Sequence, residues 1–336
     1  MKYIALVPVL FNLLSCGSGS SSDSSAASLQ AEIMDNSGSS SAEIELNVSC
    51  SIVKAIDSQT DLEKCETRFE GSQREWLIFT PVKNENQTNL PSPLLISLHG
   101  GGDYAEYNVD YTGFIPLAAQ EDIIVVYPQG AEDTEKGVTG WNAEYIGDAG
   151  RADDVKFIHL MIDWIGSNYR VDLERVYVAG FSNGARMSHH LACNLGSKIA
   201  AIAAVSGSMG RSTYQNCATP NPLAVMQIHG LADVNEYAVE SDFTESPATT
   251  ITFWKEVNDC GNFEQQALAD QNGDGVGGSL DIHSACSYEL EVRLIELENF
   301  GHEWPSIGNG KSNADIDAAQ IIWDFMRDFD AQGFRE

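Results

Sequence analysis

The sequence predicts an α/β fold in which a mostly parallel central sheet is covered by helices on both faces. Continuous apolar runs, bounded by proline, glycine or charged residues, alternate along the chain with segments whose apolar residues recur at helical spacing. Such runs are typical of parallel strands buried on both faces, and their alternation with helices indicates a parallel sheet. The 336 residues, 43% of them hydrophobic, suffice for one large domain, although two smaller ones are the alternative.

Each element follows from a local pattern. Strands are expected at 76–79, 94–98, 123–127, 175–179, 201–205, 223–228 and 292–297. A helix is expected over about 153–169, because apolar residues recur at helical spacing at Val155, Ile158, Ile162 and Ile165. A second helix follows Ser182 and extends to about residue 195. A closing helix is expected to carry the apolar residues Ile322, Phe325, Met326 and Phe329.

The N-terminus resembles a bacterial lipoprotein signal. Lys2 precedes an apolar stretch at 4–11 that is too short to span a membrane. The Leu-Leu-Ser-Cys that ends at Cys16 looks like a lipobox, in which the cysteine is diacylated and becomes the mature N-terminus. We therefore expect a signal peptide at 1–15 and a lipid anchor on Cys16, with an ordinary cleaved signal as the alternative.

The segment 16–45 is expected to be a lipidated flexible tether, because it is rich in serine, glycine, alanine and aspartate. Gly17, rather than aspartate, follows the cysteine, which by resemblance to the bacterial sorting rule favours the outer membrane; a secreted protein is the alternative. The single folded domain would then occupy 46–336. The formal net charge of -30 argues against nucleic acid as a partner. Membrane contact is expected through the lipid alone, and the protein is expected to be a monomer.

Six cysteines remain beyond Cys16, an even number that indicates disulfides in an exported protein. Several connectivities are possible. Proximity along the chain favours the pairs Cys50–Cys65, Cys193–Cys217 and Cys260–Cys286. Buried free thiols are the alternative, and a zinc site is a weaker one because the chain has no C-x-x-C pair.

The most informative motif is Gly-Phe-Ser-Asn-Gly at 180–184, which follows a predicted strand and precedes a predicted helix. Glycines on both sides of the serine let a strand turn sharply into a helix, so that Ser182 would present its hydroxyl at the end of the sheet. This context makes Ser182 a candidate nucleophile.

His-Gly-Gly-Gly at 99–102 follows the strand 94–98 and resembles the oxyanion loop of esterases and lipases. Glycine N–H groups can approach a developing oxyanion without obstruction by side chains. Gly101 or Gly102 would supply one donor, and the N–H of Asn183, the residue after the candidate nucleophile, would supply the other. A plain glycine turn is the alternative.

The acid and the base are expected on later loops. Asp233 comes just past the strand 223–228 and is the predicted acid, with Asp242 as the fallback. His302 follows the last predicted strand and is the predicted base, whereas His283 lies among polar loop residues. The chain order of serine, aspartate and histidine is that of α/β hydrolases.

Together, the motifs resemble the polyhydroxybutyrate depolymerase and feruloyl or acetylxylan esterase family of α/β hydrolases over about residues 70–330. The resemblance implies the α/β-hydrolase fold and a secreted serine esterase that needs no metal or organic cofactor. The segments that carry it are 99–102, Tyr127-Pro128-Gln129-Gly130, Trp141-Asn142, Asp153-Asp154-Val155, 180–184, His229-Gly230 with Asp233, and Gly301-His302-Glu303-Trp304-Pro305.

By that resemblance, Ser182 would attack an ester carbonyl while His302 takes its proton and Asp233 orients the imidazole. The expected substrates are feruloyl or acetyl esters of plant polysaccharide, with polyhydroxybutyrate or another polyester as the alternative. A non-catalytic, lipid-anchored binding protein is a further alternative. So is peptidase or acyltransferase chemistry with the same three residues.

Tyr104, Trp141 and Trp304 are candidates to line the substrate cleft. Aromatic faces suit a feruloyl ring, a sugar or a polyester chain. For each of the three, ordinary packing is the alternative.

An acidic segment at 270–281 matches the spacing of a calcium loop. Asp270, Asn272, Asp274 and Asp281 would supply the oxygen ligands. The alternative is an acidic Asp-Gly hairpin turn between two strands.

Overall fold

The computed structural model describes residues 45–57, 60–81, 90–133, 137–143, 152–217, 220–234, 243–307 and 314–335. The expected signal peptide, Cys16, almost all of the tether and the fallback acid Asp242 lie outside the described residues. Residues Ile44–Glu336 form one compact unit. Within the described ranges, no helix has both the length and the apolar character needed to cross a bilayer.

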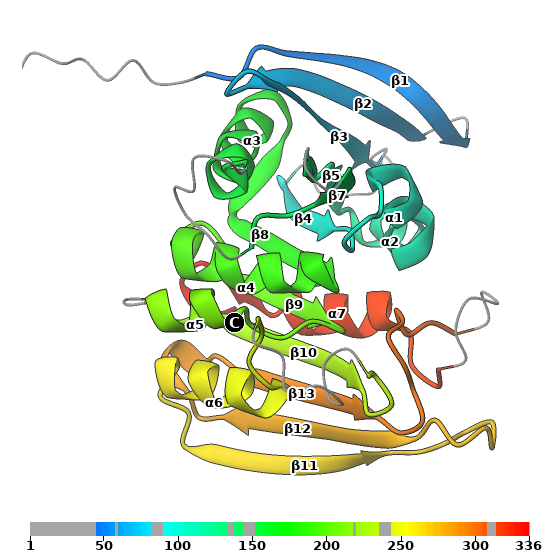
Figure 1. Cartoon of the computed structure of the whole chain (residues 1–336), viewed down its shortest axis with the longest axis vertical. Helices are drawn as coiled ribbons and strands as arrows, with labels where there is room; N and C mark the ends of the chain where they lie inside the picture. Colours follow the sequence, from blue (N-terminus) through cyan, green and yellow to red (C-terminus); the bar gives the residue numbers. More distant parts are fainter. Residues whose placement is uncertain are drawn as a thin grey trace, which may run out of the picture. The chain divides into compact units, whose positions relative to one another are not determined.

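The fold is built on an 11-stranded sheet with the strand order β1-β2-β3-β5-β4-β8-β9-β10-β13-β12-β11 (Figure 1). The six strands from β5 to β13 in that order pair in parallel, and antiparallel strands flank them on both edges. This arrangement confirms the predicted mostly parallel central sheet. The strands are β1 (Val48–Asp57), β2 (Thr60–Phe69), β3 (Ser72–Thr80), β4 (Ser92–Leu98), β5 (Ile124–Pro128), β8 (Val171–Phe181), β9 (Ala201–Val205), β10 (Ala224–Gly230), β11 (Asn262–Leu268), β12 (Gly278–Ser284) and β13 (Val292–Leu297).

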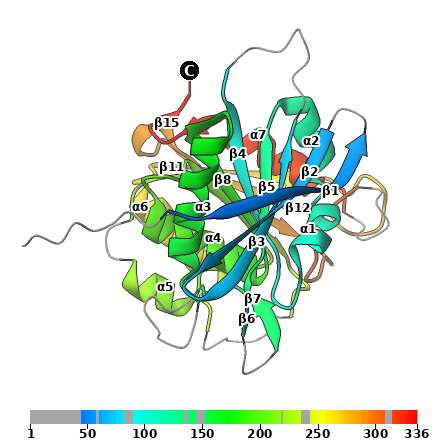
Figure 2. The same ribbon diagram turned by 90° about the horizontal axis from the view of Figure 1, so that it is seen from above.

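Helices cover both faces of this sheet, as Figure 2 shows from above. One face packs against α1 (Ala105–Thr112), α2 (Phe114–Glu121) and α7 (Ala318–Met326). The other packs against α3 (Asp154–Asn168), α4 (Asn183–Leu195) and α6 (Pro247–Val257). Successive side chains of a strand point to opposite faces, so Val126 and Tyr127 of β5 enter different cores. The central strands are therefore apolar throughout.

The structure contains all the predicted strands and helices, with shifted ends. The closing helix is the main correction, because α7 ends at Met326 and Phe329 belongs to the short strand β14 (Phe329–Asp330), which pairs with β15 (Gly333–Phe334). Phe329 packs against Phe325 from outside the helix, with 5.2 Å between ring centroids. Helical spacing could not distinguish this contact from one more turn of helix.

Several elements were not predicted: the outer antiparallel strands β1, β2, β11 and β12, the helices α1, α2, α5 (Arg211–Asn216) and α6, and the small β6 (Ala131–Asp133) and β7 (Val138–Gly140) pair. The edge strand β11 is mostly exposed and polar. An exposed strand buries no apolar face, so it lacks the periodicity on which the predictions rest.

Three disulfides connect elements that are near in sequence. Cys50–Cys65 joins facing residues of β1 and β2. Cys193–Cys217 joins α4 to the end of α5, and Cys260–Cys286 joins the turn after α6 to the segment after β12. These are the three pairs favoured by proximity along the chain.

Candidate active site

The candidate residues meet because four parallel strands end at the same edge of the sheet. The oxyanion loop follows β4, Ser182 follows β8, Asp233 follows the end of β10, and His302 follows β13. The carboxyl ends of parallel strands are the usual place for a site in an open α/β sheet. Residues that are far apart in sequence are thus brought into hydrogen-bonding distance.

Ser182 occupies a strained turn between β8 and α4. Its backbone has φ 54° and ψ -114°, which is uncommon for a residue with a side chain. A Cβ on Gly180 would overlap the carbonyl oxygen of Gly184, and a Cβ on Gly184 would overlap that of Leu98. The two glycines of the motif are therefore required by close backbone packing, which holds the serine in its turn.

Ser182, His302 and Asp233 form one hydrogen-bonded series. His302 Nε2 lies 2.9 Å from Ser182 Oγ, and His302 Nδ1 lies 2.7 Å from Asp233 Oδ2. The aspartate is 1% exposed, whereas the histidine side chain remains one-quarter exposed. This arrangement can remove the hydroxyl proton through the imidazole while the carboxylate fixes the ring.

The backbone packing also explains why the two later loops meet. A Cβ on Gly230 would overlap the carbonyl oxygen of Phe300. Ala232 N–H donates to the same carbonyl at 2.9 Å. The loop that carries Asp233 is therefore held directly against the loop that carries His302.

The oxyanion loop requires one correction. The N–H of Gly102 donates to the Thr139 carbonyl at 2.7 Å, so it is engaged within the protein. Gly101 lies opposite Asn183, since a Cβ on Gly101 would be 3.5 Å from the Cβ of Asn183. The N–H of Asn183 belongs to the first turn of α4, where backbone donors have no partner within the helix. The geometry thus favours Gly101 and Asn183, and not Gly102, as the pair of donors.

Two of the three predicted cleft residues are buried instead. Trp141 is 5% exposed, and its indole N–H donates to the His99 carbonyl at 2.9 Å. Trp304 is 2% exposed and packs edge-on against Phe114. Neither tryptophan therefore presents an open face to a substrate. Tyr104, which follows the oxyanion loop, is 59% exposed and can contact a substrate.

The sequence did not predict that aromatic side chains pack against His302. Phe181 packs against His302 with 5.1 Å between ring centroids, and Tyr111 packs edge-on against Phe181. The Tyr111 hydroxyl also accepts a hydrogen bond from the backbone N–H of Trp304 at 2.9 Å. Phe181 lies inside the serine motif and could have been noticed, but Tyr111 is on α1, whose sequence has no clear helical pattern.

The acidic segment forms a turn between β11 and β12, as the hairpin alternative predicted. Asp270 accepts hydrogen bonds from the N–H groups of Gly275 and Gly273, and these lower the pKa of its carboxyl group. Asp281 lies on β12, where it accepts from Gln265 on the facing strand at 2.8 Å. Asp281 is therefore wrong as a partner of the turn; the carboxylate near Asp270 and Asp274 is that of Asp315.

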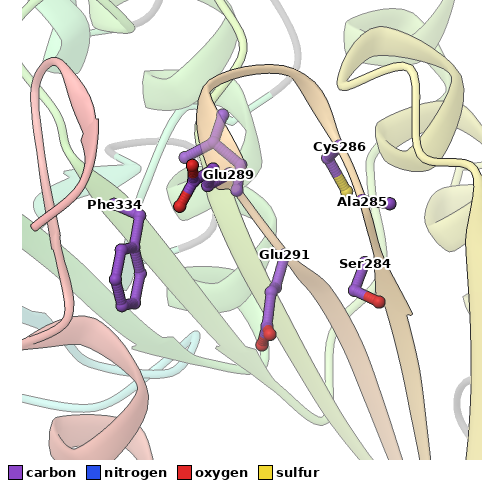
Figure 3. Close-up of a pocket in the computed structure, with 7 residues that line it drawn as sticks. Ser284, Ala285, Cys286, Glu289, Glu291 and Phe334 are labelled. Carbon is purple, nitrogen blue, oxygen red and sulfur yellow. The ribbon is translucent and has the colours of Figure 1, made fainter.

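A cavity of about 250 Å³ lies away from these residues (Figure 3). It is beside the end of β12, which pairs antiparallel with the beginning of β13. The cavity is thus near the amino ends of the parallel strands, whereas Ser182 is at their carboxyl ends. Its lining residues are Ser284, Ala285, Cys286, Glu289, Leu290, Glu291 and Phe334.

The fold is shared with solved esterases. An acetyl xylan esterase from Aspergillus awamori superposes with a TM-score of 0.52 at 17% sequence identity, covering 76% of this chain and 94% of that chain. The structural class is therefore the α/β hydrolase, as the motifs predicted.

Sequence comparison specifies the resemblance further. The family model described as esterase PHB depolymerase matches residues 86–229. The chain is 27% identical over 271 residues to a bifunctional acetylxylan esterase/xylanase of Neocallimastix patriciarum, covering 79% of this chain and 35% of that protein. It is 26% identical over 252 residues to feruloyl esterase B of Piromyces equi, covering 71% and 42%.

The chain therefore spans less than half of the length of these two relatives. The comparisons confirm the predicted resemblance to this group of esterases and support an esterase.

Four histidines other than His302 are buried in the elements that carry the candidate residues. Burial lowers the pKa of His99, His189 and His190 to about 4 and that of His229 to about 3. His189 hydrogen-bonds Gln227 at 2.9 Å, and Gln227 contacts His229. All four imidazoles are therefore neutral in the folded protein near pH 7.

Because burial lowers the pKa of these four imidazoles, we expect the free energy of unfolding to fall in mild acid. In the unfolded chain each takes up a proton near its ordinary pKa of about 6.5, whereas in the folded chain it stays neutral down to about 4. Their contribution to stability is thus fully present above pH ~6.5 and is lost as the pH falls towards 4. Urea unfolding at pH 7.5, 6 and 5 should show this decline.

The control for this prediction is His190→Asn, which removes one titrating group that lies outside the hydrogen-bonded series of Ser182, His302 and Asp233. Its stability should fall less steeply with pH than that of the natural chain, by up to about 1.4 kcal/mol per pH unit. Identical slopes for the two proteins would contradict the assignment of a buried, neutral His190.

Proposed function

We propose that the protein is a serine esterase in which Ser182, His302 and Asp233 are the nucleophile, the base and the acid. The observation that carries the proposal is the hydrogen-bonded series of the three side chains. The His302 imidazole lies 2.9 Å from the Ser182 hydroxyl on one side and 2.7 Å from the buried Asp233 carboxylate on the other. The strained turn of Ser182 and the esterase relatives support the same function.

The first half of the reaction acylates the serine. His302 Nε2 accepts the Ser182 hydroxyl proton while the oxygen attacks the ester carbonyl carbon. The tetrahedral intermediate then collapses, and the imidazolium donates its proton to the departing alcohol. Throughout, the Asp233 carboxylate accepts a hydrogen bond from His302 Nδ1–H and stabilises the imidazolium.

The second half releases the acid. A water molecule gives a proton to His302 and attacks the acyl-enzyme, and the proton returns to Ser182 as the ester bond to the enzyme breaks. The N–H groups of Gly101 and Asn183 would stabilise the oxyanion in both halves. This chemistry needs no metal or organic cofactor.

The proposed substrates are feruloyl or acetyl esters of plant polysaccharide. The names of the matched relatives support this class, and the exposed ring of Tyr104 beside the oxyanion loop suits contact with a sugar or a phenolic acid. Polyhydroxybutyrate is the second candidate, because the matching family model is described as esterase PHB depolymerase.

A non-catalytic binding protein on the same fold is the alternative to an enzyme. We expect the natural chain to hydrolyse para-nitrophenyl acetate and Ser182→Ala to lose at least about 10³-fold in kcat with an unchanged unfolding transition, because the nucleophile is removed. Hydrolysis that survives in Ser182→Ala would reject the nucleophile. Absence of hydrolysis in the natural chain would favour the binding protein.

A substrate panel distinguishes the ester classes. Methyl ferulate, acetylated xylan and polyhydroxybutyrate should be compared by kcat/KM at one pH and enzyme concentration. We expect one of the two plant esters to give the highest value. A higher value for polyhydroxybutyrate would instead assign the protein to the polyester hydrolases.

We also propose that the enzyme works outside the cytoplasm, anchored by lipid on Cys16 and carried by the tether 16–45. The three disulfides support an oxidising compartment. The lipobox-like sequence supports a lipid anchor, and Gly17 after the cysteine supports the outer membrane, with secretion as the alternative.

Membrane attachment is tested by fractionating cells that express the full chain. Cys16→Ala should lose membrane association, because the thiol that receives the diacylglycerol is absent. Ser18→Ala, a change of similar size in the same segment, should stay with the membranes. A Cys16→Ala protein that still fractionates with membranes would contradict the anchor.

A further inference from the structure

The orientation of the peptide unit between Gly100 and Gly101 is fixed by hydrogen bonds to its carbonyl oxygen. His99 Nδ1 lies 2.7 Å from the Gly100 carbonyl oxygen, and the N–H of Asp103 donates to the same oxygen at 3.2 Å. A trans peptide is planar, so its N–H points opposite to its C=O. The bonds that fix the Gly100 carbonyl therefore also fix the direction of the Gly101 N–H, one of the two proposed oxyanion donors.

The proton on His99 is assigned by its other nitrogen. The N–H of Gly130 donates to His99 Nε2 at 2.9 Å, so Nε2 must be the acceptor. The ring is fully buried, and burial lowers its pKa to about 4, so it is neutral near pH 7 and carries its single proton on Nδ1. Nδ1–H is then the donor to Gly100.

Trp141 connects this histidine to the second oxyanion donor. Its indole N–H donates to the His99 carbonyl at 2.9 Å, and its ring contacts the imidazole with 5.0 Å between centroids. The Trp141 backbone N–H donates to Asn183 Oδ1 at 2.7 Å, and Asn183 Nδ2 donates back to the Trp141 carbonyl at 3.2 Å. One tryptophan thus ties the loop of Gly101 to the start of α4.

The packing around residues 99–102 leaves the orientation of Gly101 to the hydrogen bonds of the Gly100 carbonyl. A Cβ on Gly100 would lie 2.8 Å from Asp103 Oδ2 and 3.1 Å from the Phe181 ring, so that residue is closely packed. Gly101 is exposed, and a Cβ there would meet only ordinary contact. Side-chain packing does not hold Gly101, so its orientation depends on the peptide that precedes it.

We propose that His99 and Trp141 are positioning residues of the oxyanion hole: His99 orients the Gly101 N–H through the Gly100 carbonyl, and Trp141 holds His99 and Asn183 in one fixed relation. The proposal rests on the proposed esterase function. Neither side chain touches the substrate, and their effect is on the transition state, where charge develops on the carbonyl oxygen.

Three variants test separately the hydrogen bond from His99 Nδ1–H to the Gly100 carbonyl and the one from the Trp141 indole N–H to the His99 carbonyl. Asparagine carries its amide nitrogen near the place of Nδ1, so His99→Asn can still donate to Gly100. Glutamine reaches the place of Nε2, so His99→Gln loses that donor. Trp141→Phe keeps an aromatic ring but removes the indole N–H. We expect kcat to fall by about 10- to 100-fold in His99→Gln and Trp141→Phe, with less loss in His99→Asn and little change in KM.

The decisive readout compares two inhibitors on enzyme whose Ser182-dependent hydrolysis has been established. A trifluoromethyl ketone forms a tetrahedral adduct with an oxyanion, whereas the product acid binds without one. Affinity for the ketone should fall by the same factor as kcat, and affinity for the product acid should be unchanged. His190→Asn replaces a buried histidine of α4 that contacts neither the oxyanion loop nor Trp141 in the bonds described above, and it should keep both affinities.

The inference is overturned if folded His99→Gln and Trp141→Phe keep the natural kcat, while the natural enzyme is active and Ser182→Ala is not. It is also overturned if both inhibitors weaken together, because that result indicates general disorder of the site. If His99→Gln does not fold, Trp141→Phe carries the same test. Failure of the esterase function itself would appear differently, as an inactive natural chain.

Discussion

The site depends on one constraint, the close backbone contact where β8 turns into α4. Neither Gly180 nor Gly184 has room for a Cβ, because each would overlap a carbonyl oxygen of the neighbouring backbone. This contact brings the start of α4 against the ends of β8 and β4. Ser182 can therefore hold its positive φ, which its N–H to the Val205 carbonyl, at 2.9 Å, also supports.

The same kind of contact recurs around the serine. Gly207, just past β9, lies where a Cβ would overlap the Ser182 carbonyl oxygen, and Gly230 lies equally close to Phe300. Successive loops at the carboxyl edge of the sheet thus approach one another through bare backbone. The hydrogen bonds of His302 to Ser182 and Asp233 span 120 and 69 residues, and the close approach of these loops at Gly207 and Gly230 helps to bring the three residues together.

A buried ion pair supports the loop behind this site. Arg74 Nη2 lies 2.6 Å from Asp154 Oδ1, and both side chains are almost completely buried. Asp154 Oδ2 accepts the Asn142 N–H at 2.7 Å, next to Trp141. Loss of one partner of such a pair leaves an uncompensated buried charge, which is strongly destabilising. The pair therefore fixes the segment from which Trp141 reaches the oxyanion loop.

The sequence alone determined the α/β class, the central strands, the serine motif and the chain order of the three candidate residues Ser182, Asp233 and His302. These features depend on local patterns, such as apolar runs, glycines beside a serine, and residues at strand ends. Nearest-neighbour pairing of the cysteines also needed only short separations along the chain. The exposed edge strand β11 could not be predicted in this way, because it buries too little apolar surface to leave a pattern.

Only the tertiary structure decided which groups of the site are available. The N–H of Gly102 is engaged by Thr139 from a distant segment, and Trp141 and Trp304 are buried by elements that no local pattern brings near them. Asp281 faces Gln265 because the hairpin register places it on β12. Each of these outcomes depends on contacts between segments far apart in the chain. A residue's type indicates which bonds it can form, but long-range packing determines which partner it meets.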